Sequence, residues 1–196
     1  MAETIQKPTR ERILDAANKL FYTEGIRAVS VDAIAEKAGI TKKSLYYHFK
    51  SKDELIAGYL ASRDQPNLAA FSRWFDEADG DIADKTEAMF RQVAQNARHP
   101  KWRGCGFIRT AAELANMPGH PAVTVGAQHK KKFEGWLCEQ YRDAGIKEPA
   151  PLARSVVLLM EGAFSMMLIH RDATYAEAAA STARGLVSLQ QKTSVS

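Results

Sequence analysis

Apolar residues recur at the spacing of amphipathic α-helices along most of the chain, and no useful length of it alternates between apolar and polar residues as a β-strand would. The first helix ends before Gly25, and its apolar face consists of Ile13, Leu14, Ala17, Leu20 and Phe21. Later segments predict helices over residues 52–63, 68–78, 82–97, 107–115, 122–144, 149–170 and 175–190. Pro66 is expected to break or redirect the chain between two of them. The predicted fold class is all-α, with about nine to ten helices.

The segment from residue 31 to residue 49 has the pattern of two short helices joined by a tight turn. One face of its first helix carries only small and apolar side chains, namely Val31, Ile34, Ala35 and Ala38. Gly39 follows at the position where a left-handed conformation is cheapest for glycine. Thr41 can cap the second helix, because its hydroxyl accepts a hydrogen bond from an otherwise unpaired backbone N–H. Leu45 and Phe49, four residues apart, would anchor that second helix to the core.

The remaining face of the second helix is rich in cations, hydroxyls and aromatic rings. It consists of Lys42, Lys43, Ser44, Tyr46, Tyr47 and His48. Side chains of these types bind phosphates and read base edges. The segment therefore predicts a helix-turn-helix that binds DNA.

The stretch ILDAANKLFYTEGIRAVSVDAIAEKAGITKKSLYYHFKSKDEL resembles the N-terminal domain of TetR-type transcriptional repressors. The resemblance covers about residues 8–60 and includes a predicted capping box, Ser51 to Glu54, that starts the next helix. It implies a DNA-binding domain of three helices over residues 8–60, followed by a helical domain for ligand binding and dimerisation over residues 61–196. It also implies a homodimer whose partners are a double-stranded DNA operator and a small-molecule effector. A soluble, cytoplasmic protein is expected because the N-terminal residues lack the apolar run of a signal peptide and no apolar stretch is long enough to span a bilayer.

The resemblance also assigns roles along the recognition helix. The first residues, Thr41 to Ser44, would lie nearest the base edges, and Lys42 or Lys43 would donate to guanine or contact phosphate alone. Tyr46 would pack and touch the DNA backbone or a thymine methyl, whereas Tyr47 and His48 would hold phosphates. The predicted DNA-binding set is Ser30, Thr41, Lys42, Lys43, Ser44, Tyr46, Tyr47, His48 and Lys52.

The charge distribution fits this interpretation better than the modest net charge of +4 does. Four lysines and no acidic residue lie between Thr41 and Lys52. Lys7, Arg10 and Arg12 are predicted to add a basic N-terminal arm. Clustered basic residues are typical of a phosphate-binding face.

For the C-terminal half, the resemblance implies an apolar pocket among the middle helices for a small, largely hydrophobic or aromatic effector. Its candidate residues are Phe71, Phe75, Met89, Phe90, Val93, Phe107, Arg109, Glu113, Trp136 and Phe164, with His120 and Glu161 as further polar residues that could orient a ligand. Aromatic and methionine residues at helical spacing are also typical of plain core. Both interpretations stay open for each of these residues.

The last long helices carry an apolar surface wider than one core-facing stripe, which includes Leu152, Val156, Leu159, Met160, Ala163, Phe164, Met167 and Leu168. The resemblance implies that two such helices form a four-helix bundle with those of a second copy. The alternative is that this surface is buried within one subunit.

Other features indicate little further chemistry. The two cysteines are too few for a disulfide framework. Cys105 lies between glycines and near Arg103 and Arg109, so a redox switch is one interpretation and a pair of reduced, half-buried thiols is the favoured one. The tract from His129 to Lys132 is interpreted as a solvated face.

No metal, cofactor or membrane partner is predicted. The histidines lack ligand spacing, and the longest apolar stretch, 156–169, is shorter than the roughly 20 residues that span a bilayer. No enzyme motif is present. The leading hypothesis is a ligand-responsive dimeric repressor. An activator or global DNA-organising protein on the same fold, and a helical small-molecule-binding protein or enzyme with a vestigial DNA head, are the alternatives.

Overall fold

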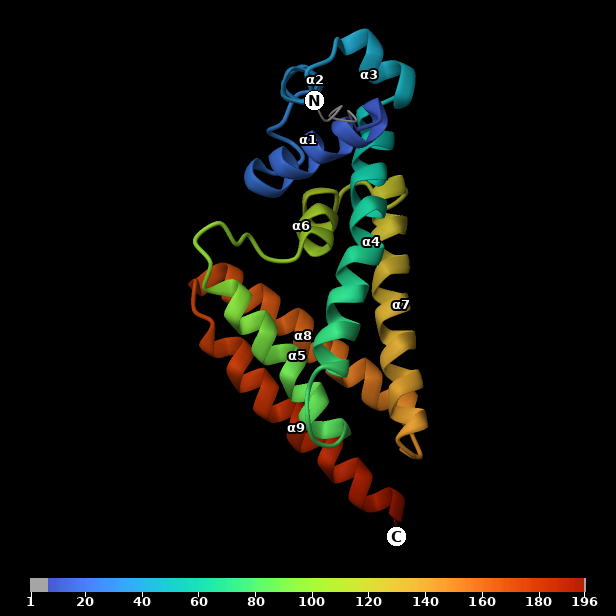
Figure 1. The fold of residues 1–196 in the computed structure, drawn as a ribbon, viewed down its shortest axis with the longest axis vertical. Helices are drawn as coiled ribbons and strands as arrows, with labels where there is room; N and C mark the ends of the chain where they lie inside the picture. The colour runs from blue at the N-terminus through green and yellow to red at the C-terminus, as the bar shows by residue number, and fades with distance from the viewer. Residues whose placement is uncertain (1–6, 196) are drawn as a thin grey trace, which may run out of the picture. The chain divides into compact units, whose positions relative to one another are not determined.

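The computed structural model describes residues 7–195, and over that range the chain forms nine α-helices and no β-strand. The helices are α1 (Thr9–Glu24), α2 (Val31–Ala38), α3 (Lys42–His48), α4 (Lys52–Asp76), α5 (Ile82–Ala97), α6 (Gly106–Glu113), α7 (Pro121–Asp143), α8 (Pro149–His170) and α9 (Thr174–Val195) (Figure 1). The all-α prediction is thereby confirmed. Most predicted helix ends lie within one or two residues of those found, except that α9 extends further than residue 190.

The prediction that Pro66 ends a helix is wrong. The helix α4 continues from Lys52 through Pro66 to Asp76, so two predicted helices are one. A proline inside a helix removes one backbone hydrogen bond and favours a kink. Apolar side chains are buried on both sides of it, including Leu60 before the proline and Phe75 after it. Burial of such residues stabilises a helix more than local propensity does, which explains why the helix persists.

The chain divides into two compact units. Unit 1 contains the residues up to Asp64 together with 106–127, and unit 2 contains 65–105 and 128–196. The segment 106–127, which includes α6, therefore packs with the N-terminal helices, and α4 and α7 each contribute residues to both units. The predicted functional domains, 8–60 and 61–196, stay a prediction.

The core of unit 1 joins the first four helices. The fully buried residues Ile13, Ile34 and Leu45 come from α1, α2 and α3 respectively. The ring of Phe21 lies 5.5 Å from that of Tyr59 on α4. This core fixes α3 by one face and leaves its other face available.

Unit 2 has its own hydrophobic core, built on α5, α8 and α9 with parts of α4 and α7 (Figure 1). Helix α9 packs along α5 and also against α8. An aromatic group lies beside this core, in which Phe133 is 4.6 Å from Phe71 and 5.9 Å from Trp136 between ring centres. Tyr141 is fully buried, and its hydroxyl lies 3.2 Å from Thr86 Oγ1. Burial raises the pKa of Tyr141, with the hydrogen bond to Thr86 acting in the opposite direction.

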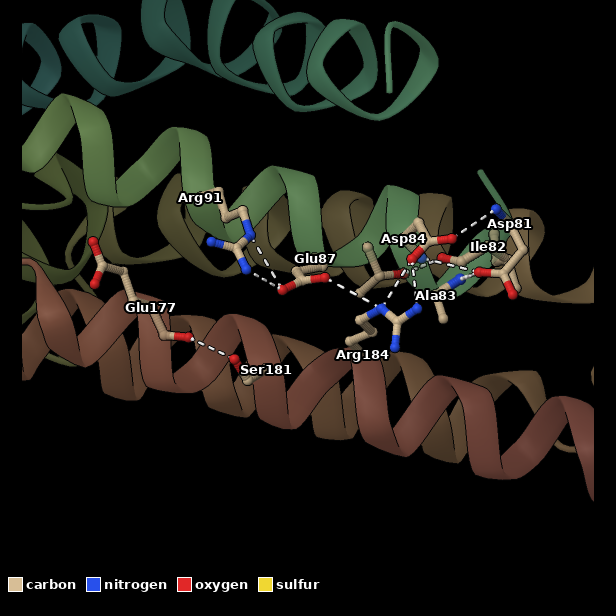
Figure 2. A network of polar contacts seen from close by, with 10 residues as sticks. Asp81, Ile82, Ala83, Asp84, Glu87, Arg91, Glu177, Ser181 and Arg184 are labelled. Carbon is tan, nitrogen blue, oxygen red and sulfur yellow. Dashed lines mark hydrogen bonds and ion pairs between the residues drawn. The ribbon is translucent and has the colours of Figure 1, made fainter. Parts of the chain in front are cut away.

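A charged network on the surface joins α5 to α9 (Figure 2). Arg184 of α9 contacts Asp84 at 2.8 Å and Glu87 at 3.3 Å, and Arg91 also pairs with Glu87 at 2.6 Å. The N-terminus of α5 has a complete capping box, in which Asp81 and Asp84 each accept from the other's backbone N–H. The hydrogen bond from Arg184 and the backbone N–H of Asp81 lower the pKa of Asp84.

Helix α8 is long and apolar enough to pass a length and composition test for a membrane-spanning helix. Core helices of soluble proteins pass the same test. The inward face of α8, which includes Val156, Met160 and Met167, belongs to the core of unit 2.

Candidate nucleic-acid interface

The turn between α2 and α3 has the geometry that its sequence predicts. Gly39 is left-handed, with φ 65° and ψ 43°, and the next residue, Ile40, donates from its backbone N–H to the carbonyl of Ala35 at 3.0 Å. The Thr41 hydroxyl accepts from the backbone N–H of Ser44 at 3.1 Å, which caps α3. These contacts fix where α3 begins and confirm the predicted helix-turn-helix.

Two side chains predicted in the DNA-binding set also hold its backbone. Thr41 caps α3, and Ser30 caps α2 by accepting from the backbone N–H of Ala33 at 3.1 Å. Both residues are exposed. Their position at helix N-termini, where backbone N–H groups face outward, suits them to lie beside a phosphate.

One turn contact was missed by sequence reasoning. Arg12 donates to the carbonyl oxygens of Ala38 at 2.6 Å and Gly39 at 3.0 Å, which are carbonyls at the end of α2. A cation is favourable at the C-terminus of a helix because the last carbonyls carry partial negative charge. Arg12 therefore fastens α1 to the turn that precedes the recognition helix.

The predicted basic N-terminal arm needs correction, because Arg10 and Arg12 lie inside α1. The Arg10 guanidinium lies 4.9 Å from the centre of the Phe49 ring, and Lys7 pairs with Asp15 at 2.7 Å. These cations therefore contact other residues of unit 1. The partners of Arg10 and Arg12 lie far along the sequence, so the sequence alone does not reveal these contacts.

The two faces of α3 differ sharply in burial. Leu45 and the following Phe49 are 0% and 1% exposed, as predicted, whereas Tyr46 is 42% exposed and Tyr47 is 86% exposed. Lys43 is exposed as well, and the His48 ring lies edge-on to Tyr47 at 5.3 Å. An aromatic ring exposed to this extent contributes little to the stability of the fold, because little of its surface is buried. This face is therefore open to contacts with another molecule.

Lys42 forms an ion pair with an acidic residue of the preceding helix. Its ammonium lies 2.9 Å from the Asp32 carboxylate of α2, and both side chains are exposed. The hydrogen bond and charge of Asp32 raise the pKa of Lys42. Lys42 and Lys43 are thus both exposed on the same helix, but Lys42 is paired with a carboxylate.

Lys52 begins α4, where the helix N-terminus favours an anion. The Ser51 hydroxyl accepts from the backbone N–H of Glu54 at 3.1 Å, as the predicted capping box requires. The Glu54 carboxylate accepts from the backbone N–H of Lys50 at 2.7 Å, one residue before the position that a standard box uses. The cap therefore also orders the backbone between α3 and α4.

Two predicted ligand residues on α6 contact α1 and the loop that follows it. The Arg109 guanidinium donates to the carbonyl of Tyr22 at 2.7 Å. The Glu113 carboxylate accepts from the backbone N–H groups of Ile26 at 3.2 Å and Arg27 at 3.0 Å. Sequence reasoning gave no indication of these contacts, because the partners are more than 80 residues apart.

The other predicted ligand residues lie in two cores. Phe107 is buried in unit 1, whereas unit 2 contains Phe71, Phe75, Met89, Phe90, Val93, Trp136 and Phe164. His120 is buried in unit 1, and its Nε2 lies 3.3 Å from Asp53 Oδ1 but makes no hydrogen bond. A role in effector binding stays a prediction for all of them.

The tract from His129 to Lys132 is not the uniform solvated face that was predicted. His129 is 3% exposed, and the Lys130 ammonium contacts Glu161 at 2.6 Å. The period of helix α7 turns these two side chains inward, as it does the buried Phe133, while Lys131 stays exposed. Over residues 7–195, no group of three or more His, Cys, Asp or Glu side chains is placed to hold a metal ion.

Comparison with known proteins identifies the same region. Residues 13–59 match the family model described as bacterial regulatory proteins, tetR family. The chain is 45% identical over 60 residues to the uncharacterized HTH-type transcriptional regulator TtgW of Pseudomonas putida, which covers 31% of this chain and 45% of that protein. It is 24% identical over 164 residues to the HTH-type transcriptional regulator YjdC of Escherichia coli, which covers 83% and 85% of the two chains.

Solved structures extend the likeness to nearly the whole fold. A crystal structure of a TetR-family transcriptional regulator from Streptomyces coelicolor matches 96% of this chain and 96% of its own, with 27% sequence identity and a TM-score of 0.76. The match to TtgW, by contrast, spans less than half of that protein. The relatives found are transcriptional regulators. The family to which they belong consists of DNA-binding proteins and not of enzymes.

Proposed function

Because this chain belongs to the TetR family of bacterial regulatory proteins, we propose that it is a cytoplasmic transcriptional repressor. It binds a palindromic operator as a homodimer and leaves that operator when a small apolar or aromatic effector binds. The exposed face of α3 carries this proposal. That face contains Lys43 and the 86% exposed Tyr47 on a helix whose opposite side is fully buried.

The local geometry of α3 supports insertion into the major groove. In helix-turn-helix proteins the first residues of the recognition helix contact base edges, and flanking side chains contact the DNA backbone. Thr41 to Ser44 occupy the first positions here, and Tyr47, His48 and Lys52 follow on the side suited to phosphates. Lys42 would exchange its contact with Asp32 for a contact with DNA, and both partners are exposed enough to separate.

An apolar groove on α8 and α9 supports the homodimer. The groove has a volume of about 520 Å³ and is lined by residues that include Leu158, Gly162, Met166 and Leu186. Leu158 is 67% exposed, and a side-chain atom at Gly162 would meet no neighbour within 4 Å, so a second helix can approach closely there. Only part of the predicted apolar surface lines this groove, because Val156, Met160 and Met167 belong to the core of unit 2. A dimer would place two reading heads about 34–36 Å apart, or a multiple of that distance.

Effector release follows from linkage. An effector that binds better to a state whose two DNA-binding domains no longer fit the operator weakens operator binding. The factor by which the effector lowers operator affinity equals the factor by which the operator lowers effector affinity. The aromatic group in unit 2, with Phe71, Phe133 and Trp136, favours an apolar or aromatic effector. A thermal-shift screen across such compounds tests this part of the proposal, and a uniformly flat screen would contradict it.

The DNA-binding part is tested by fluorescence anisotropy of the purified protein with the intergenic DNA beside its own gene, across a range of salt concentrations. We expect tight binding that falls steeply with salt, because phosphate contacts release counterions. Tyr47→Ala should abolish most of the binding without unfolding the chain, since the ring is exposed. Lys101→Ala, which removes an exposed cation from unit 2, is the matched control. Weak binding that Tyr47→Ala leaves unchanged would contradict the proposal.

The homodimer is tested by sedimentation of Leu158→Arg and Gly162→Arg. Each places a charge in the apolar groove, so we expect both to shift the protein toward monomer. Glu77→Arg, at an exposed position outside the groove, should sediment as the parent protein does. A parent protein that is monomeric at micromolar concentration would overturn this part.

A further inference from the structure

One buried histidine of unit 1 lies against the start of α4. His120 directly precedes α7, and its side chain is 1% exposed. Its Nε2 lies 3.3 Å from Asp53 Oδ1 in the first turn of α4, although no described residue forms a hydrogen bond with that nitrogen. Asp53 directly follows Lys52, which under the proposed function lies beside a DNA phosphate. A buried side chain that can gain a proton is therefore found next to the DNA-binding end of α4.

The hydrogen bond of His120 determines which ring nitrogen carries the proton. Its Nδ1 accepts from the backbone N–H of Ala122 at 3.1 Å, so Nδ1 holds no proton. The neutral ring then carries its proton on Nε2, the nitrogen that faces Asp53. A second proton can bind only at Nδ1, where it displaces the Ala122 N–H. Protonation thus exchanges a cap at the N-terminus of α7 for a full positive charge beside Asp53.

Asp53 is the ionisable group that lies against this ring. The segment 114–127, which contains the ring, has no other ionisable residue. On α4, Lys52 and Glu54 flank Asp53, and the Glu54 carboxylate is held by the helix cap. On α6, the Glu113 carboxylate is held by the loop that follows α1, and the α1 arginines described above contact other groups. A charge on the imidazole would therefore act mainly on Asp53.

Bound DNA would favour the protonated ring. Phosphates at the start of α4 bring negative charge close to Asp53, and like charges repel each other. A proton on His120 offsets the charge of that carboxylate, and a nearby polyanion in turn stabilises the charged imidazolium. Because the ring is buried, salt screens this interaction less than it screens one between exposed charges. By linkage, a protein that binds DNA more tightly in its protonated form takes up protons when it binds DNA.

We propose that His120 is a positioning residue that couples operator binding to proton uptake. Its imidazolium pairs with Asp53 and holds that carboxylate away from the DNA phosphates. Operator affinity therefore increases as the pH falls from about 8 to about 6, within the range where histidine changes charge. The inference rests on DNA binding by unit 1 as proposed above. It adds the proton as a regulating species that acts independently of the small-molecule effector.

The test is fluorescence anisotropy of the full chain with the intergenic DNA, at a series of pH values and constant ionic strength. We expect the affinity of the parent protein to increase a few-fold between about pH 8 and about pH 6. His120→Asn should bind as the parent does at the higher pH and lose most of this increase. Asparagine keeps an oxygen that can accept from the Ala122 N–H at the cap position, but it does not titrate. His48, which is proposed to contact phosphate, is present in both proteins, so its own titration cancels from the ratio of their affinities.

Two further variants separate proton linkage from a purely structural role of His120. Asp53→Asn removes the carboxylate, so it should bind DNA more tightly than the parent at about pH 8 and gain less on acidification. His99→Asn is the matched control, because His99 Nδ1 also accepts from a backbone N–H two residues on, that of Lys101 at 3.1 Å. His99 is exposed and belongs to unit 2, so this variant should keep the pH dependence of the parent.

Calorimetric titration in two buffers of different ionisation enthalpy measures the proton uptake directly and does not require His120→Asn to fold. Near neutral pH the parent should take up protons when it binds DNA, and Asp53→Asn, changed at an exposed side chain, should take up fewer. Equal affinity gains in the parent and a folded His120→Asn, or equal proton uptake in the parent and Asp53→Asn, would overturn the inference and leave the proposed function intact. Absence of DNA binding by the parent at every pH would overturn both.

Discussion

The buried pair of Thr86 and Tyr141 leads to a prediction about stability in which the size of the loss depends on which hydroxyl group is left without its partner. The Thr86 hydroxyl donates to the carbonyl of Ile82 at 2.8 Å, so its single proton is already used. The Tyr141 hydroxyl, 3.2 Å away, must therefore donate to Thr86 Oγ1. Tyr141 and Thr86 are both 0% exposed, so water cannot replace a lost partner.

The two single substitutions should lower the free energy of unfolding by different amounts. Tyr141→Phe removes the donor and leaves Thr86 still bonded to Ile82, so the free energy of unfolding should fall by about 0.5–1.5 kcal/mol. Thr86→Val leaves the Tyr141 hydroxyl unpaired in the core, so the fall should be about 1–3 kcal/mol. The double variant buries two apolar groups of nearly the same shape. It should be more stable than Thr86→Val alone by about 1 kcal/mol, although it carries one more substitution.

Urea unfolding followed by far-ultraviolet circular dichroism measures this cycle, at one protein concentration for all four proteins because association changes apparent stability. An unchanged dependence on urea across the set would show that the midpoints report stability. Tyr141 does not donate to Thr86 in the way described if the two single losses simply add in the double variant, or if Tyr141→Phe costs more than Thr86→Val. Either result would mean that Tyr141 has a different partner or that the core rearranges.

Three further predictions concern unit 1. Lys43→Ala should cost about 1–3 kcal/mol of operator binding and relax specificity at one base pair, whereas Lys52→Ala should weaken all sequences alike and reduce the salt slope by about one; identical behaviour in competition binding would contradict base reading by Lys43. Asp32→Asn should release Lys42 and increase DNA affinity a few-fold in anisotropy, and a loss of affinity would show that the pair orders the recognition helix instead. Glu113→Gln keeps one acceptor for two backbone N–H groups, so the free energy of unfolding should fall by about 1 kcal/mol; an unchanged urea midpoint would show that these bonds contribute nothing.

The helix-turn-helix could be predicted because its determinants are local. Gly39 and Thr41 specify a turn and a cap through their own backbone and side-chain chemistry, and the structure has both. The prediction that Pro66 ends a helix failed for the opposite reason. The local preference of proline was outweighed by the burial of distant apolar residues in α4.

Several contacts of the interface could not be predicted, because they join residues far apart in the sequence. Arg12 reads as one more cation of a basic arm until its contact with Ala38 is known. Glu113 reads as a ligand residue until it is found on the backbone of Ile26. The chemical type of each side chain was evident from the sequence, but the partner that decides its role comes from tertiary packing.

The most direct test of the central claim is selection of binding sites from randomised duplex DNA by the purified protein. A helix-turn-helix dimer should enrich two inverted half-sites whose centres lie one helical turn, about 34–36 Å, or a multiple of it apart. Lys43→Ala should then lose preference at one position of each half-site and keep their spacing. No enriched sequence, or a single half-site without a partner, would contradict a dimeric regulator that reads DNA through α3.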